Sequence, residues 1–216
     1  MLLPTIKEIK PGVIQFHYDN NVQLGASFLR LQEYYESISE RFFRKKFQFA
    51  DYIIWYASEN DGEFSYFDDY TGFNINGEVV KEFFQTYSAD DLSSGELLMK
   101  SISDQQKDTK FCFIGTCVGE EYTIPHEVAH AMFYLHPEYK RKMLGLVRKL
   151  PKKTQELCKR NLKKLLYNPY VMEDEIHAYM STSPPSEVLD VLGVKNSAAM
   201  QRPFKNFYKK WMEEVK

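Results

Sequence analysis

The segment TIPHEVAHA, positions 123–131, holds two histidines four residues apart, with a glutamate directly after the first. Residues i and i+4 share one face of an α-helix, so the imidazoles of His126 and His130 can reach the same metal ion. Imidazole nitrogens suit zinc. Glu127 stands where its carboxylate can reach a water beside the metal without binding the metal itself. The pattern therefore predicts a zinc site with His126 and His130 as ligands and Glu127 as catalytic base.

Working outward, the hydrophobic periodicity predicts a short apolar strand at 110–116 before this segment and mostly helices after it. Together the predicted elements indicate an α+β fold in a single domain, 1–216, with a small mixed α/β lobe over 1–120 and a mainly helical lobe over 121–216. A further strand is predicted at 13–18, and an aromatic hairpin or ordered loop at 62–77. Helices are predicted at 25–41, 50–58, 79–87, 92–106, 125–135, 138–150, 153–166, 169–180 and 202–216, with a short turn at 187–192.

Composition sets limits on the class of protein. The chain has 216 residues, of which 44% are hydrophobic and 15% aromatic, and its net charge is −2. It can therefore form a sizeable core, and it carries no overall charge that would favour nucleic acid or membrane partners. No apolar run is long enough to span a bilayer, the first residues lack the features of a signal peptide, and three cysteines do not form a disulfide framework. A cytoplasmic protein is the expectation.

Charge is nonetheless unevenly distributed. Between Asp51 and Asp104 there are twelve acidic residues and two basic ones, whereas between Lys140 and Lys164 there are eleven basic residues and one acidic one. The basic run lacks interleaved aromatic residues, which favours solvated helix surfaces over a nucleic-acid groove.

The histidine pair and the strand before it resemble the zincin metallopeptidases, over about a third of the chain. In that family an edge strand commonly precedes the active-site helix and pairs with an extended substrate. The resemblance implies that Phe111–Gly115 is this edge strand, with Phe111, Phe113 and Gly115 contacting a peptide substrate.

A catalytic zinc site also needs a third protein ligand and an open position for water. The segment VMEDEIHAY, positions 171–179, resembles the second ligand helix of the gluzincins, the thermolysin-type zincins, in which a Glu-x-x-Ala pattern supplies the glutamate. The resemblance implies that Glu175 is the third ligand, with the small Ala178 allowing close approach of the two helices. Tyr179 departs from the family, because many gluzincins have an aspartate there, so another group must accept the outer N–H of the histidines.

His136 is the alternative third ligand. It follows His126 at the spacing of the metzincin pattern H-E-x-x-H-x-x-G-x-x-H, and Met180 would be the methionine of that family's Met-turn. Phe133 stands where the pattern has glycine, and a phenylalanine resists the sharp turn required there, which favours Glu175. Glu173 and Asp174 are interpreted as acids in the first turn of a helix, where they are favourable to the helix dipole. A misplacement of the helix by one turn would exchange either of them with Glu175 as the ligand.

Two further sets of residues complete the candidates. A deformylase-like site would use a cysteine as third ligand, but Cys112 and Cys117 lack the Gly-Cys-Leu context of that family and are expected to be buried beside the strand.

A second catalytic group is needed to stabilise the oxyanion of a tetrahedral intermediate. Tyr179 is the candidate put forward, and the others by sequence distance are His177, Tyr170 and Tyr122.

The sequence thus predicts a gluzincin-like zinc metallopeptidase that binds Zn2+ through His126, His130 and Glu175 and hydrolyses peptide bonds with Glu127. The expected partner is a peptide or protein substrate. The alternatives are a non-catalytic zinc-binding module and a zinc hydrolase that acts on a non-peptide amide.

Overall fold

The computed structural model describes residues 3–106 and 109–215, and it shows the predicted α+β composition, with several helices and one four-stranded sheet. The chain divides into two compact units, Met1–Ile124 and Pro125–Lys216. This division lies four residues after the lobe boundary expected at 120/121. Within the described residues, no helix combines the length and the apolar character that a membrane span requires.

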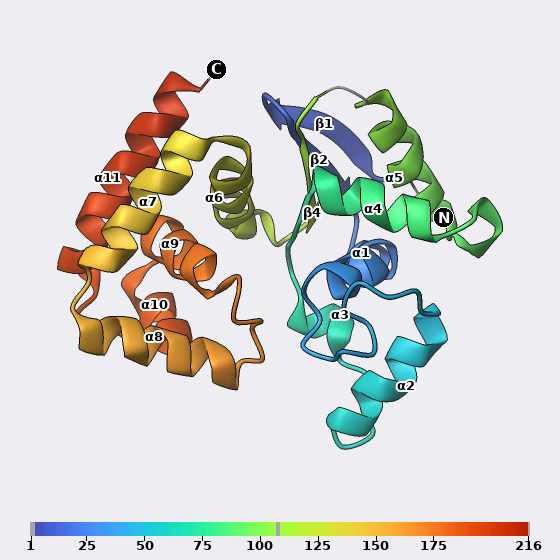
Figure 1. Cartoon of the computed structure of the whole chain (residues 1–216), viewed down its shortest axis with the longest axis horizontal. Helices are drawn as coiled ribbons and strands as arrows, with labels where there is room; N and C mark the ends of the chain where they lie inside the picture. Colours follow the sequence, from blue (N-terminus) through green and yellow to red (C-terminus); the bar gives the residue numbers. More distant parts are fainter. Residues whose placement is uncertain (1–2, 107–108, 216) are drawn as a thin grey trace. The chain divides into compact units, whose positions relative to one another are not determined.

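The sheet belongs to the N-terminal unit and is mixed (Figure 1). Its strands are β1 (Thr5–Lys10), β2 (Val13–Tyr18), β3 (Phe73–Asn76) and β4 (Cys112–Cys117). Their order is β1-β2-β4-β3, with β2 and β4 parallel and the two outer strands antiparallel to their neighbours. Strands β2 and β4 match the sequence prediction, whereas β1 was not predicted.

Among the described residues of the N-terminal unit, five α-helices and two 3-10 turns lie between or after these strands. They are α1 (Asn21–Glu36), α2 (Phe49–Glu59), α3 (Tyr66–Asp69), α4 (Gly77–Thr86), η1 (Ala89–Asp91), α5 (Ser94–Gln105) and η2 (Glu121–Thr123). Side-chain caps stabilise the first turns of several of these helices. Asn20 accepts a hydrogen bond from the Gln23 amide at the start of α1, and Ser93 forms a capping box with Glu96 at the start of α5. The predicted helices all form, with bounds shifted by a few residues.

The core of this unit is largely aromatic. Phe16 and Phe113 project from adjacent strands with ring centroids 4.9 Å apart, and Phe28 of α1 stacks on Phe73 at 5.3 Å. Gly115 allows this packing, because a Cβ there would lie only 2.7 Å from Leu24 of α1. The helix therefore sits directly on the sheet.

The prediction that Phe111–Gly115 is an edge strand is wrong. Strand β4 pairs with β2 from Cys112 to Cys117 and with β3 from Cys112 to Gly115, so its backbone is hydrogen-bonded on both sides along that stretch. Phe111 and Phe113 are buried, and Gly115 contacts α1. The cause is β3, four residues within the segment predicted as a hairpin or loop, which occupies the side of β4 where a peptide would have to pair.

The C-terminal unit is helical within its described residues. Its helices are α6 (Ile124–Leu135), α7 (Pro137–Lys149), α8 (Lys152–Lys164), α9 (Met172–Thr182), α10 (Pro185–Leu192) and α11 (Ala198–Glu214). Helix α9 packs against α7, α8, α10 and α11, and α7 also packs against α11 (Figure 1). This central position of α9 holds its buried residues in fixed places.

Candidate metal centre

Two helices of the C-terminal unit bring three potential metal ligands together. Helix α6 carries His126 and His130 one turn apart, and α9 carries Glu175. The two Nε2 atoms lie 3.1 Å apart. Glu175 Oε2 lies 3.7 Å from His126 Nε2, and Glu175 Oε1 lies 3.5 Å from His130 Nε2. Within 3–106 and 109–215, this is the one group of three or more potential ligands that comes together.

The spacing of these atoms fits zinc. A tetrahedral ion with ligand bonds of about 2.0–2.2 Å holds neighbouring donor atoms about 3.3–3.6 Å apart. The closest approaches, 3.1, 3.5 and 3.7 Å, lie near that distance, with one Glu175 oxygen facing each histidine. Glu175 Oε2 is also buried without a hydrogen-bond partner, which is costly for a carboxylate oxygen unless something else compensates it. Two imidazoles and one carboxylate are the donor set of a catalytic zinc site with an open fourth position.

Asp174 is the group that accepts the hydrogen bond from the outer nitrogen of His130, which could not be assigned from the sequence. Its Oδ1 accepts a hydrogen bond from Nδ1 of His130 at 2.8 Å, and it lies 3.0 Å from Nδ1 of His177. A carboxylate at Nδ1 fixes the ring's orientation and leaves Nε2 free to act as a ligand. Burial lowers the pKa of the His130 imidazole, but the charges of Asp174 and Glu175 outweigh this and raise that pKa well above its ordinary value.

Glu127 lies on the same helix as the two histidines and is buried, with 8% of its surface exposed. Burial raises the pKa of its carboxyl group, and the neighbouring charge of Glu175 adds to the increase, although the two histidines oppose it. A carboxylate that holds a proton more readily is better suited to accept one from water and pass it on.

Tyr179, one turn after Glu175 on α9, lies against His126. Its ring centroid is 4.5 Å from that of His126, and its hydroxyl is 3.0 Å from the hydroxyl of Tyr167. Burial raises the pKa of Tyr179, so the phenol keeps its proton and can donate a hydrogen bond. Tyr167, in the segment before α9, was not identified from the sequence because no periodic pattern links it to the site.

The other oxyanion candidates are either occupied by other contacts or exposed. His177 is fully buried, stacks on Phe133 at 4.6 Å, and its Nδ1 lies 2.6 Å from the Asp174 carbonyl oxygen. Its contacts are therefore with Asp174 and the surrounding rings. Tyr170 is half exposed, at 50%, and Tyr122 is exposed and belongs to the N-terminal unit.

The competing third ligands are not part of this group. The ring of His136 packs against Trp211 with centroids 5.5 Å apart. Cys112 donates to Asn74 Oδ1 and Cys117 to Asn21 Oδ1, both within the N-terminal unit. The described residues thus bring Glu175 to the histidine pair and give the alternatives other contacts.

No family model, curated protein or solved structure matches this chain. The functional assignment therefore depends on the geometry of its own residues.

Proposed function

We propose that this protein is a zinc-dependent metallopeptidase of the gluzincin type, with His126, His130 and Glu175 holding the metal and Glu127 acting as base. One observation carries the proposal: two imidazoles and a carboxylate from two helices converge with their ligand atoms within 4.8 Å of one another, and Glu175 Oε2 is buried without a hydrogen-bond partner.

The proposed reaction is hydrolysis of an amide. When bound, zinc acts as a Lewis acid that polarises the substrate carbonyl and lowers the pKa of a nearby water. Glu127 accepts a proton from that water as its oxygen forms a bond to the carbonyl carbon. Glu127 then gives the proton to the amide nitrogen as the C–N bond breaks, which leaves a carboxylic acid and an amine and restores the Glu127 carboxylate. The proton of the new acid passes to the amine, so the released products are a carboxylate and an ammonium ion.

Tyr179 is proposed to donate a hydrogen bond to the oxygen that becomes negative in the tetrahedral intermediate. Its contact with the His126 ring places it beside the ligands, and the Tyr167 hydroxyl holds the phenol in position. Asp174 is a positioning residue, because it acts on the site through His130.

Peptides are proposed as substrates from the resemblance of the two ligand helices to the gluzincins. Because β4 is paired on both sides from Cys112 to Gly115, the proposal does not assign that stretch to the substrate. A purely structural zinc site closes its fourth position with a protein ligand. Among the described residues, the group of potential ligands has three members, which leaves a fourth position for water. A structural site would also give Glu127 no role.

The experiment that tests this function is an assay of the purified protein on a mixed peptide library, with added zinc or with a chelator. New amino termini that appear only with zinc support the proposal. Zinc binding without cleavage of the library would favour a non-catalytic module, and cleavage of simple acyl amides but not peptides would favour the non-peptide amidase.

A further inference from the structure

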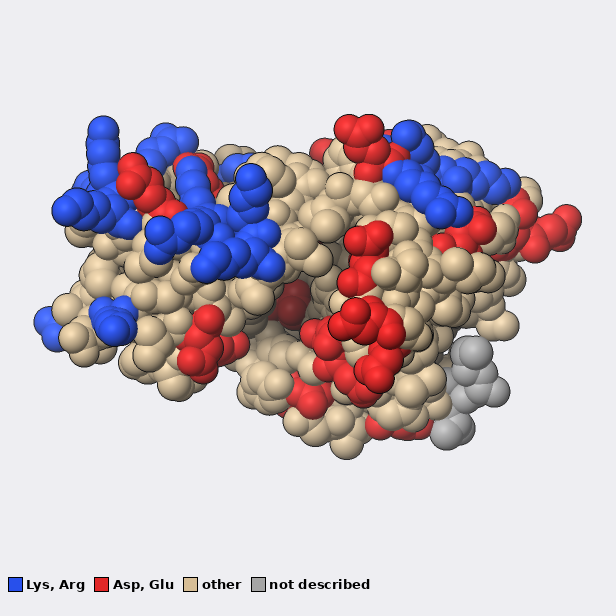
Figure 2. Space-filling view, turned by 90° about the horizontal axis from the view of Figure 1, so that it is seen from below, with Lys and Arg blue, Asp and Glu red and all other residues tan. Residues whose placement is uncertain are grey.

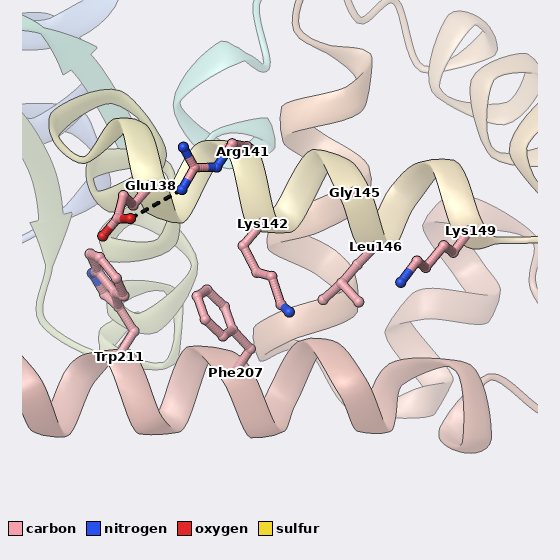
Figure 3. A pocket seen from close by; sticks show the side chains of 8 residues that line it. All are labelled: Glu138, Arg141, Lys142, Gly145, Leu146, Lys149, Phe207 and Trp211. Carbon is pink, nitrogen blue, oxygen red and sulfur yellow. Dashed lines mark hydrogen bonds and ion pairs between the residues drawn. The ribbon is translucent and has the colours of Figure 1, made fainter.

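A second feature of the C-terminal unit lies away from the ligands, in a groove between α7 and α11. Its volume is about 330 Å³, within the range of ligand-binding clefts. Figure 3 shows Phe207 and Trp211 pointing from α11 toward α7, and Lys142 reaching down between Phe207 and Leu146. Every residue that lines the groove belongs to this unit.

The groove is basic. Arg141, Lys142 and Lys149 line it with a single acid, Glu138. Glu138 accepts a hydrogen bond from Arg141 at 3.0 Å, and within the described part of the chain this is the one ion pair that α7 forms. Lys142 and Lys149 therefore keep their charges available. Figure 2 shows Lys and Arg side chains gathered on the surface of the C-terminal unit, as expected from the run of basic residues between Lys140 and Lys164.

Gly145 keeps the groove open. It lies inside α7, where glycine costs up to about 1 kcal/mol relative to alanine. Neither backbone nor packing requires it, because its φ is not positive and a Cβ there would meet no atom within 4 Å. A larger side chain at this position would project into empty space in the middle of the groove.

We propose that this groove binds an acidic peptide segment of a partner protein, in extended form, with an apolar side chain seated on Phe207 and Leu146. The groove follows α7 from Glu138 to Lys149, a rise of about 16 Å at roughly 1.5 Å per residue. An extended peptide rises about 3.3 Å per residue, so the groove accommodates about five residues. Carboxylates of such a peptide match the Lys142 and Lys149 side chains, and this binding is separate from the proposed hydrolysis.

The aromatic residues favour a peptide over single-stranded nucleic acid. Bases bind such grooves by stacking on free aromatic faces. The Phe207 ring already stacks on Tyr139 at 5.7 Å, and the Lys142 ammonium lies 5.8 Å from its centroid. Trp211 packs against Phe207 and Tyr139. The rings therefore act as an apolar floor.

The test is fluorescence anisotropy with labelled Glu-Glu-Phe-Glu-Glu, on the full chain with a chelator present so that the result does not depend on the metal. We expect saturable binding. The double variant Lys142→Glu/Lys149→Glu should weaken it roughly ten-fold or more. The matched variant Lys153→Glu/Lys164→Glu, with the same charge change on exposed positions of α8, should weaken it less than about two-fold.

Substitution at Gly145 separates shape from charge. Gly145→Phe should weaken binding roughly ten-fold with no change of charge, whereas Gly145→Ala should bind as the wild type does, and both should fold because each residue favours a helix more than glycine does. The proposal is overturned by equal weakening in the two double variants, by wild-type affinity in Gly145→Phe, or by no saturation at about 1 mM peptide. Tighter binding of labelled oligothymidine, lost in the same groove variants, would assign the groove to nucleic acid instead.

Discussion

Asp174 Oδ1 and His130 Nδ1 lie 2.8 Å apart, on the side of the imidazole opposite the nitrogen that faces Glu175. This contact orients His130 and has a measurable consequence. Asp174→Ala should weaken zinc affinity 10–100-fold, as loss of such an outer partner typically does. Competition with a chromogenic chelator measures the affinity. The control is Glu173→Ala, which removes the neighbouring acid and its 3.4 Å contact with Lys159 but leaves the histidines untouched. Equal affinity in the two variants would contradict the role of Asp174.

Glu127→Gln should retain zinc but lose peptidase turnover by a factor of roughly 10²–10⁴, because an amide cannot accept the proton of the attacking water. Metal analysis and the peptide assay on the same preparation report both properties. A variant that holds zinc and still cleaves at the wild-type rate would show that the proposed base is wrong, whatever the ligands are.

Tyr179→Phe should lower kcat roughly 10²-fold with a smaller effect on KM, since an oxyanion donor acts mainly in the transition state. Tyr167→Phe leaves the Tyr179 hydroxyl in place and removes only its 3.0 Å partner, so it should cost less. If Tyr167→Phe is the more damaging change, the donor is Tyr167 and the assignment of Tyr179 fails.

Glu33 gives the N-terminal unit a pH-dependent stability. It is buried, accepts a hydrogen bond from the Tyr66 hydroxyl at 3.1 Å, and burial raises its pKa to about 7 from 4.5. The folded state therefore binds more protons than the unfolded state between these values. The free energy of unfolding should fall as pH rises from about 4.5 to about 7, by a contribution on the order of 3 kcal/mol from this group.

Glu33→Gln isolates that contribution, because glutamine resembles the protonated acid and does not titrate. Urea unfolding should give similar stabilities for the two proteins at pH 5, and a more stable variant at pH 8. A constant difference between the two proteins across this range would mean that the pKa of Glu33 is not raised. The metal site is common to both and cancels in the comparison.

Local patterns predicted the parts of this structure that local physics determines. The i, i+4 spacing placed His126 and His130 on one face of α6, and the similar helix of the gluzincins pointed to Glu175. Asp174 was interpreted only as a first-turn acid, because the sequence does not reveal that it lies opposite the His130 ring. Its position next to Glu175, in a chain with Tyr179 where an aspartate is usual, is the signal that could have identified it.

Local patterns of this kind could not predict the order of the strands in the sheet. Strand β4 reads as a short apolar strand from its residues alone, and whether it lies at an edge depends on what pairs with it. Its partner β3 has only four residues and stands some 40 positions earlier, within an aromatic segment rich in Asp, Gly and Asn. Strand β1 alternates little in hydrophobicity. It pairs with β2 because the chain reverses at Gly12, which has a positive φ. The long-range pairing of β3 with β4, unlike the hairpin of β1 and β2, leaves no local trace in one sequence.

Zinc content in two matched variants tests the proposed centre most directly. Elemental analysis after purification without chelator should find one zinc ion per chain in the wild type. Glu175→Ala should lose it, because two histidines alone do not hold a catalytic ion firmly, and His136→Ala, whose ring packs on Trp211, should retain it. Zinc retained in Glu175→Ala and lost in His136→Ala would transfer the third-ligand role to His136, and a wild-type protein that neither contains nor takes up a transition metal would contradict the metal centre itself.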